Sequence, residues 1–166
     1  MHSMTQVIGI DPGLVHTGVV SLMFNSEDRV VTVQPHVVDG PDAVETATWI
    51  RTTHTSYEKP YIFGEKYVPR QHLNSDERMV KAEAAFLMAV PRVKWLRNQG
   101  VRSIVTQPLM ESLEVWQFTT VTHHQDLRAA ARVALYGMCK VKELNGVLAD
   151  YTRDLLDGDP WEVMVV

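Results

Sequence analysis

The alternation of apolar and polar positions predicts three strands near the start of the chain. Residues 7–10 form a short apolar run that ends at Asp11. Residues 17–24 are rich in β-branched and apolar side chains, and residues 29–35 alternate with a period of two. Because only the turn residues 25–28 separate the second strand from the third, we expect an antiparallel meander.

A helical period replaces the alternation in three later stretches. These predicted helices cover residues 41–57, Met79–Leu96 and 126–146. Asp42 and Glu45 have the spacing of a capping box at the start of the first helix. His54 lies on the apolar stripe of that helix, where we expect a core histidine rather than a ligand. Pro91 is an expected kink in the second helix, and Gly146 is the expected stop of the third.

Two further apolar runs predict strands between these helices. Residues 61–65 lie between Pro60 and a charged segment and end on a carboxylate, as the first strand does, which is typical of a buried parallel strand. Residues 101–106 predict a fifth strand. The pattern is ambiguous over residues 109–122, predicts a short helix over residues 148–155 and assigns no role to residues 163–166.

Length and composition favour a single domain over residues 1–166. The chain has 166 residues, of which 45% are hydrophobic and 22% are charged, enough for a substantial core. Cys139 is the only cysteine, which excludes disulfides and cysteine zinc clusters. No leader or long apolar run is present, so we expect a cytoplasmic protein. Residues 1–3 precede a second methionine, and we treat them as an expression remnant.

The formal charge of −4 is unevenly distributed along the chain. Residues 147–166 form an acidic tail with five Asp or Glu and one Arg. Residues 58–102 carry nine Lys or Arg against five Asp or Glu. This basic stretch is either a nucleic-acid-binding surface or a solvated helix face.

Three carboxylates stand at the ends of predicted elements. Asp11 follows the first strand, Glu65 ends the fourth, and Asp126 opens the last helix. If the first and fourth strands are neighbours, the three side chains meet and form a site for hard divalent cations. Two such ions can activate water and stabilise the leaving oxygen of a phosphodiester. The alternative for Asp11 is a turn-capping role in its Asp-Pro-Gly sequence.

In three motifs the sequence resembles the RuvC-like Holliday junction resolvases of the RNase H-like superfamily. These motifs are Ile8–Gly13 with Thr17 and Gly18, the strand Ile62–Glu65, and His123–Asp126 at the start of an alanine-rich helix. The resemblance implies an α/β fold with a five-stranded mixed sheet, its first three strands antiparallel, flanked by helices. It also implies a compact, phage-type homodimer that nicks branched DNA with Mg²⁺ or Mn²⁺, two ions per site, held by Asp11, Glu65 and Asp126.

Two departures from the family pattern affect what the resemblance implies. His123 occupies the position of the first acid of the family's acidic pair, so we predict that His123 is a fourth metal ligand; the alternative is a helix-capping histidine. The loop before the last helix, residues 107–122, is basic in cellular resolvases but here contains no Lys or Arg. Junction specificity is therefore less secure than nuclease chemistry, and forks and flaps are further candidate substrates.

The segment after Glu65 is the predicted DNA-contacting loop. Its Lys66, Tyr67, Arg70 and His72 combine cations with an aromatic side chain that can stack on a base. The alternative is an ordinary surface loop.

Other functions and interfaces also fit parts of the pattern. Actin-like ATPases and sugar kinases begin similarly, but they need two such domains to enclose a nucleotide. A non-catalytic RNase H-like binding module and a nuclease acting on RNA remain as alternatives. For the homodimer interface we predict the Met79–Leu96 helix through Met79, Phe86 and Val90, extended by Met88 and Trp95; the alternative is that this face is core.

Overall fold

The computed structural model describes residues 4–53, 59–66, 77–97, 99–118 and 124–166. In chain order its elements are β1 (Met4–Asp11), β2 (His16–Asn25), β3 (Val30–Asp39), α1 (Ala43–Thr52), β4 (Tyr61–Glu65), α2 (Glu77–Ala89), β5 (Val93–Leu96), α3 (Val101–Ile104), α4 (Gln107–Ser112), α5 (His124–Lys140), α6 (Lys142–Leu156) and β6 (Glu162–Val165).

The strands form one mixed sheet in the order β5-β4-β1-β2-β3-β6. The first three strands are antiparallel, as the sequence predicts, and β4, β5 and β6 run parallel to β1, β4 and β3. The predicted fold class is therefore confirmed, with six strands in the described part of the chain instead of five.

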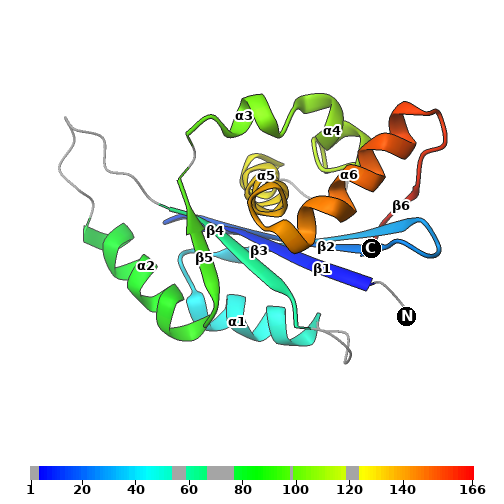
Figure 1. The fold of residues 1–166 in the computed structure, drawn as a ribbon. Coiled ribbons are helices and arrows are strands. Elements are labelled where there is room, and N and C mark those ends of the chain that lie inside the picture. Colours follow the sequence, from blue (N-terminus) through cyan, green and yellow to red (C-terminus); the bar gives the residue numbers. More distant parts are fainter. Residues whose placement is uncertain (1–3, 54–58, 67–76, 98, 119–123) are drawn as a thin grey trace.

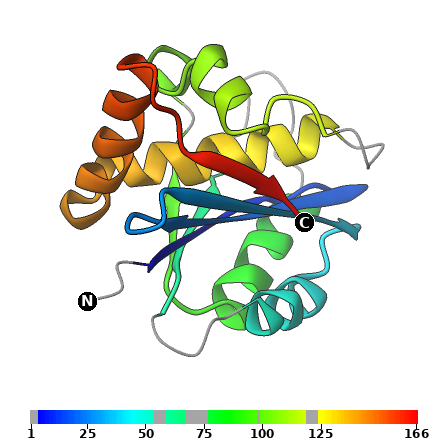
Figure 2. The same cartoon turned by 90° about the vertical axis from the view of Figure 1, so that its right-hand side faces the viewer.

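Helices cover both faces of this sheet (Figure 1). The long helix α5 lies across one face together with α3, α4 and α6, while α1 and α2 cover the other; Figure 2 shows the same layers from the side. Along β1, Val7 packs into the core beneath α5, whereas Ile8 and Ile10 pack toward α1 and α2. This alternation places Asp11 on the α5 face of the sheet.

The segment around Pro91 differs from its predicted structure. The helix ends at Ala89, Arg92 adopts a positive φ of 75°, and β5 then pairs with β4. Proline supplies no backbone donor for a continuing helix, so it terminates α2 instead of kinking it. The predicted strand at residues 101–106 is also wrong, because Val101 and Val105 are buried with helical spacing and Val101–Ile104 forms α3.

The C-terminal part contains two further corrections. Helix α5 ends at Lys140, because Val141 is extended and begins α6 as its N-cap; Gly146 lies inside α6 and does not end a helix. Residues 163–166, which had no predicted role, contribute to β6 and its pairing with β3. The partner strand lies about 130 residues earlier, so no local pattern could indicate this pairing.

The predicted dimer face on α2 is largely core. Phe86 and Val90 are fully buried and Met79 is nearly so, while Met88 is 87% exposed. The capping prediction for α1 is confirmed, because the Asp42 side chain accepts a hydrogen bond from the Glu45 backbone N–H at 2.9 Å. His54 lies outside the described residues. No described helix has the length and apolar character needed to cross a membrane.

Candidate active site

The pairing of β1 with β4 places Asp11 beside Glu65. In this parallel pair Ile10 is opposite Gly64. The next residues, Asp11 and Glu65, therefore lie side by side at the carboxyl ends of the two strands. Asp11 and Glu65 are both half-buried there, and their side chains share a hydrogen bond. The prediction that two neighbouring strands present their terminal acids together is correct.

Helix α5 brings Asp126 over the same point through a close approach to the sheet. Gly18 is the residue paired with Asp11, and a Cβ at Gly18 would overlap the backbone carbonyl of Asp126. A Cβ at Gly9 would likewise overlap the carbonyl of Ala130, one turn further along α5. Glycine at both positions therefore lets the helix backbone rest directly on β1 and β2, with Asp126 above Asp11.

The three carboxylates repel one another. The pKa of Asp11 is raised to about 8, first by burial, then by the negative charges of Glu65 and Asp126, and finally by its hydrogen bond to Glu65. Asp11 is therefore largely protonated at neutral pH when no cation is present. The site holds more negative charge than its surroundings compensate, and this charge balance favours cation binding.

Oxygen-only donors at a sheet edge fit a hard divalent cation such as Mg²⁺ or Mn²⁺. Within the described residues, no three His, Cys, Asp or Glu side chains are already arranged as a complete metal site. The nearest approach to one is the hydrogen-bonded Asp11–Glu65 pair, with Asp126 close enough to raise the pKa of Asp11. These residues fit a cation in donor type and charge, and a bound ion would replace the shared proton.

The remaining predicted site residues are only partly described. His123, Tyr67, Arg70 and His72 lie outside the described residues. Lys66 is exposed directly after Glu65, and its backbone N–H donates to the carbonyl of Leu96 at 2.8 Å.

His124, the residue after His123, is half-buried. Its Nδ1 accepts a hydrogen bond from the backbone N–H of Phe118 at 3.0 Å. This contact fixes the tautomer of the neutral ring, with the proton on Nε2, and ties the start of α5 to the preceding segment.

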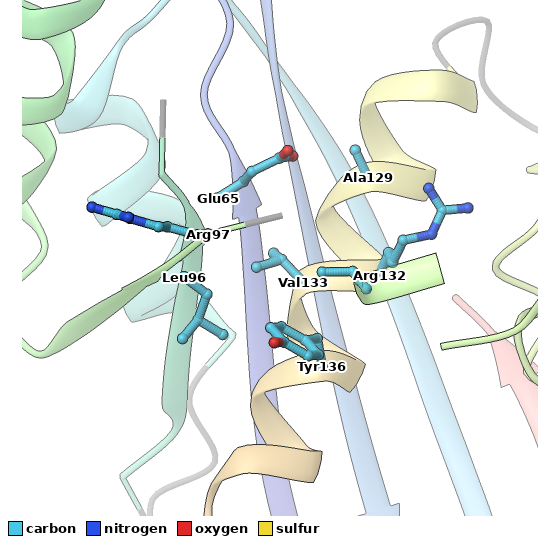
Figure 3. A pocket seen from close by; sticks show the side chains of 8 residues that line it. Glu65, Leu96, Arg97, Ala129, Arg132, Val133 and Tyr136 are labelled. Atoms are coloured by element: carbon cyan, nitrogen blue, oxygen red, sulfur yellow. The ribbon is translucent and has the colours of Figure 1, made fainter. Parts of the chain in front are cut away.

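A small hollow of about 20 Å³ lies beside Glu65, between β5, α3 and α5. This volume is enough for about one water molecule. In Figure 3 the carboxylate of Glu65 points from β4 toward α5, and Arg97 extends in the opposite direction. The aliphatic part of Arg132 lines the hollow, and its guanidinium lies on the side of α5 away from Glu65.

Arg132 and its neighbour Arg128 are not among the site residues predicted from the sequence. The available signal was their spacing, because two arginines four residues apart on the helix that carries Asp126 share one face. The basic stretch of the sequence, residues 58–102, does not include α5.

No protein-family model and no curated protein matches the sequence. In structure, the chain is similar to RuvC of T. thermophilus in complex with a Holliday junction substrate. The match covers 88% of this chain and 95% of that one, with 17% identity and a TM-score of 0.53. A second Thermus thermophilus RuvC structure matches over 88% and 96% of the two chains, with 17% identity and a TM-score of 0.52. The chain thus has the RNase H-like fold of RuvC, as the sequence motifs implied.

Proposed function

We propose that this protein is a metal-dependent endonuclease that nicks Holliday junctions and other branched DNA. The observation that carries the proposal is the convergence of Asp11, Glu65 and Asp126 at one end of the sheet, where burial and the negative charges of the other two carboxylates raise the pKa of Asp11. The shared fold with RuvC, which has been solved with a Holliday junction, supports branched DNA as the substrate.

In this proposal, Asp11, Glu65 and Asp126 hold Mg²⁺ or Mn²⁺, two ions per site, with His123 as a fourth ligand. Bound there, the ions supply activation of water and stabilisation of the leaving oxygen. The chain itself supplies the rigid support: the β1–β4 pairing fixes the first two carboxylates, and the seating of α5 on Gly18 fixes the third. Because the Asp11–Glu65 pair must lose its proton, metal binding releases a proton and weakens at low pH.

The proposal includes two symmetry-related sites in a homodimer, since a four-way junction needs two nicks. Three exposed apolar side chains on α2 support a contact there: Val80, Leu87 and Met88. Met88 belongs to the predicted interface, whereas Val80 and Leu87 do not, and the predicted Met79, Phe86 and Val90 are buried. Lys66, Tyr67, Arg70 and His72 stay the proposed DNA-contacting residues next to the site. Light scattering that gives a monomer mass both free and on a junction would contradict the dimer.

The decisive experiment compares cleavage of labelled four-way junction, fork, flap, linear duplex and RNA–DNA hybrid by the parent and by Asp11→Asn. We expect the parent to nick the junction only with Mg²⁺ or Mn²⁺. Removal of one charge-stabilising group in an active site typically costs ~100-fold or more, so the variant should be at least that much slower. With metal present, when Asp11 of the parent has lost its proton, junction binding by the variant should be unchanged or tighter, because one repulsive charge is gone.

Other outcomes of the same experiment identify the alternatives. Cleavage of the hybrid alone would replace branched DNA by RNA as the substrate. Binding without cleavage of any substrate would favour a non-catalytic module. Equal cleavage by the parent and Asp11→Asn would contradict the assignment of the site.

A further inference from the structure

Two arginines of α5 lie over the ring of Trp116, and a third arginine lies nearby on α3. Arg128 lies with its guanidinium carbon 3.9 Å from the centre of the Trp116 ring, and its Nε donates to the Trp116 carbonyl at 2.8 Å. Arg132, one turn later on α5, approaches the same ring at 5.9 Å. Arg102 on α3 is close enough to repel Arg132 electrostatically. The indole and its carbonyl thus hold one guanidinium in place while the others remain nearby.

This cluster has little compensating negative charge. Among the described residues, no carboxylate lies within 4.0 Å of the guanidinium groups of Arg102, Arg128 or Arg132. The Nε of Arg132 is buried and has no acceptor in the described structure. Burial, followed by the charges of Arg102 and Arg128, lowers the pKa of Arg132, and Glu65 opposes this shift.

A group of like charges around a buried, unpartnered donor destabilises the free protein unless an anion joins it. The guanidinium fork matches the oxygens of a phosphate, and arginines that carry no carboxylate partner keep these donors available.

We propose that Arg128 and Arg132, which lie over the Trp116 ring, and Arg102 of α3 bind a backbone phosphate of the nucleic acid strand that passes the cleavage site. This inference rests on the proposed nuclease function and adds a strand-positioning surface to it. The stem of Arg132 borders the hollow next to Glu65, while its guanidinium lies on the other side of α5 (Figure 3). The bound phosphate is therefore a different one from the phosphate that is cleaved, and its contact with the arginines fixes the register of the strand.

The test measures binding of a fluorescent four-way junction, and of a duplex of the same sequence, by anisotropy in EDTA at several salt concentrations. Arg132→Gln should raise Kd about tenfold near 0.1 M salt, as expected when a charged hydrogen bond is lost. The slope of log K against log salt should become shallower by roughly 0.9 per lost phosphate contact. Arg102→Gln should act in the same direction.

The matched control is Arg51→Gln. Arg51 is exposed on α1, on the opposite face of the sheet, so its loss should leave Kd and the salt slope unchanged. Thermal unfolding of the free protein gives a second readout. Because Arg132→Gln removes a repelled and partly buried charge, its midpoint should equal or exceed that of the parent.

The outcomes separate this inference from the nuclease proposal. If Arg132→Gln lowers the melting midpoint but keeps the parent Kd and salt slope, the arginines are structural and the phosphate site is wrong. Arginine-dependent binding by a parent that cleaves nothing supports the phosphate site and contradicts the nuclease. Cleavage by the parent, together with binding that the arginine substitutions do not change, supports the nuclease and contradicts the phosphate site. A parent that binds neither probe overturns both.

Discussion

Two groups of acids in this protein are held in opposite electrostatic environments. Near the C-terminus, Asp154 pairs with Arg29 and Arg153, each at 3.2 Å, and accepts a hydrogen bond from the Trp161 indole at 2.8 Å. At the sheet edge, Asp11 faces Glu65 and Asp126. Accordingly, the pKa of Asp154 is lowered, chiefly by the indole hydrogen bond, whereas the pKa of Asp11 is raised to about 8.

The opposite pKa shifts distinguish two kinds of acid. Asp154 stabilises the fold through its contacts, whereas Asp11, Glu65 and Asp126 are held close together by the fold despite their repulsion. The network around Asp154 fastens the segment before β6 to β2 and α6, because Trp161 packs edge-on against Phe24 of β2 and Tyr151 of α6. The acids around Asp11 contribute no such stabilisation. Their cluster persists because strand register and helix packing leave the side chains no other position, which is typical of a functional site.

The largest expected effect on stability comes from removing the charge of Asp11. Its pKa is raised relative to the unfolded chain, so the folded state binds the proton more tightly and metal-free stability falls as pH rises from about 4 through about 8. Each pKa unit is worth about 1.4 kcal/mol, so Asp11→Asn should be more stable than the parent by on the order of a few kcal/mol near pH 9. The two should converge below pH 4.

Urea unfolding in EDTA across this pH range measures the difference. Saturating Mg²⁺ should reduce it, because a cation bound to the parent offsets the same repulsion. If the stability difference between the parent and Asp11→Asn is the same at pH 5 and at pH 9, the pKa of Asp11 is not raised in the folded protein, and the contrast with Asp154 is wrong.

The next effect concerns how α5 reaches the site. In Gly18→Ala, the new Cβ overlaps the Asp126 carbonyl, so α5 must move off β2 and carry Asp126 away from Asp11. Overpacking of this kind typically costs about 2 kcal/mol. We expect that loss together with a marked loss of cleavage. The control is Gly146→Ala in α6, where a Cβ meets open space and should stabilise by roughly 0.5–1 kcal/mol. Equal stability of the two variants would show that α5 does not rest on Gly18.

The positions of the acids could be predicted from the sequence because each ends or begins a regular element. Short apolar runs located Asp11 and Glu65, and a helical period located Asp126. Gly18 belongs to the first sequence motif, but the sequence did not show that the backbone of Asp126 fills the space beside it. That helix α5 itself fills this space depends on packing between segments more than 100 residues apart.

Elements that depend on distant partners were predicted poorly. The β5 strand was assigned to a helix because its four residues follow a helical period across Pro91, and only pairing with β4 makes them extended. Likewise, residues 163–166 at β6 are all apolar, so the sequence there shows no alternation of apolar and polar positions. Arg102 comes from α3, whereas Arg128 and Arg132 come from α5, so their proximity appears only once both helices pack on the sheet.

The smallest expected effect lies at the compensated acid. Because the pKa of Asp154 is lowered in the folded state, its contribution to stability is present above the unfolded pKa near 3.8 and is lost as pH falls through the lower folded value. In Asp154→Asn the acid limb of the stability profile, below pH 4, should therefore be flatter than in the parent. The effect should be small and should shrink in salt, since the ion pairs are near the surface. Asp157→Asn removes the same charge from the end of the same helix and serves as the control. If both variants flatten the acid limb equally, general charge reduction accounts for the change. A flattening specific to Asp154→Asn would show that the contacts of Asp154 with Arg29, Arg153 and Trp161 tie β6 to the sheet. The charge of Asp154 would then stabilise the folded protein, whereas the charge of Asp11 destabilises it.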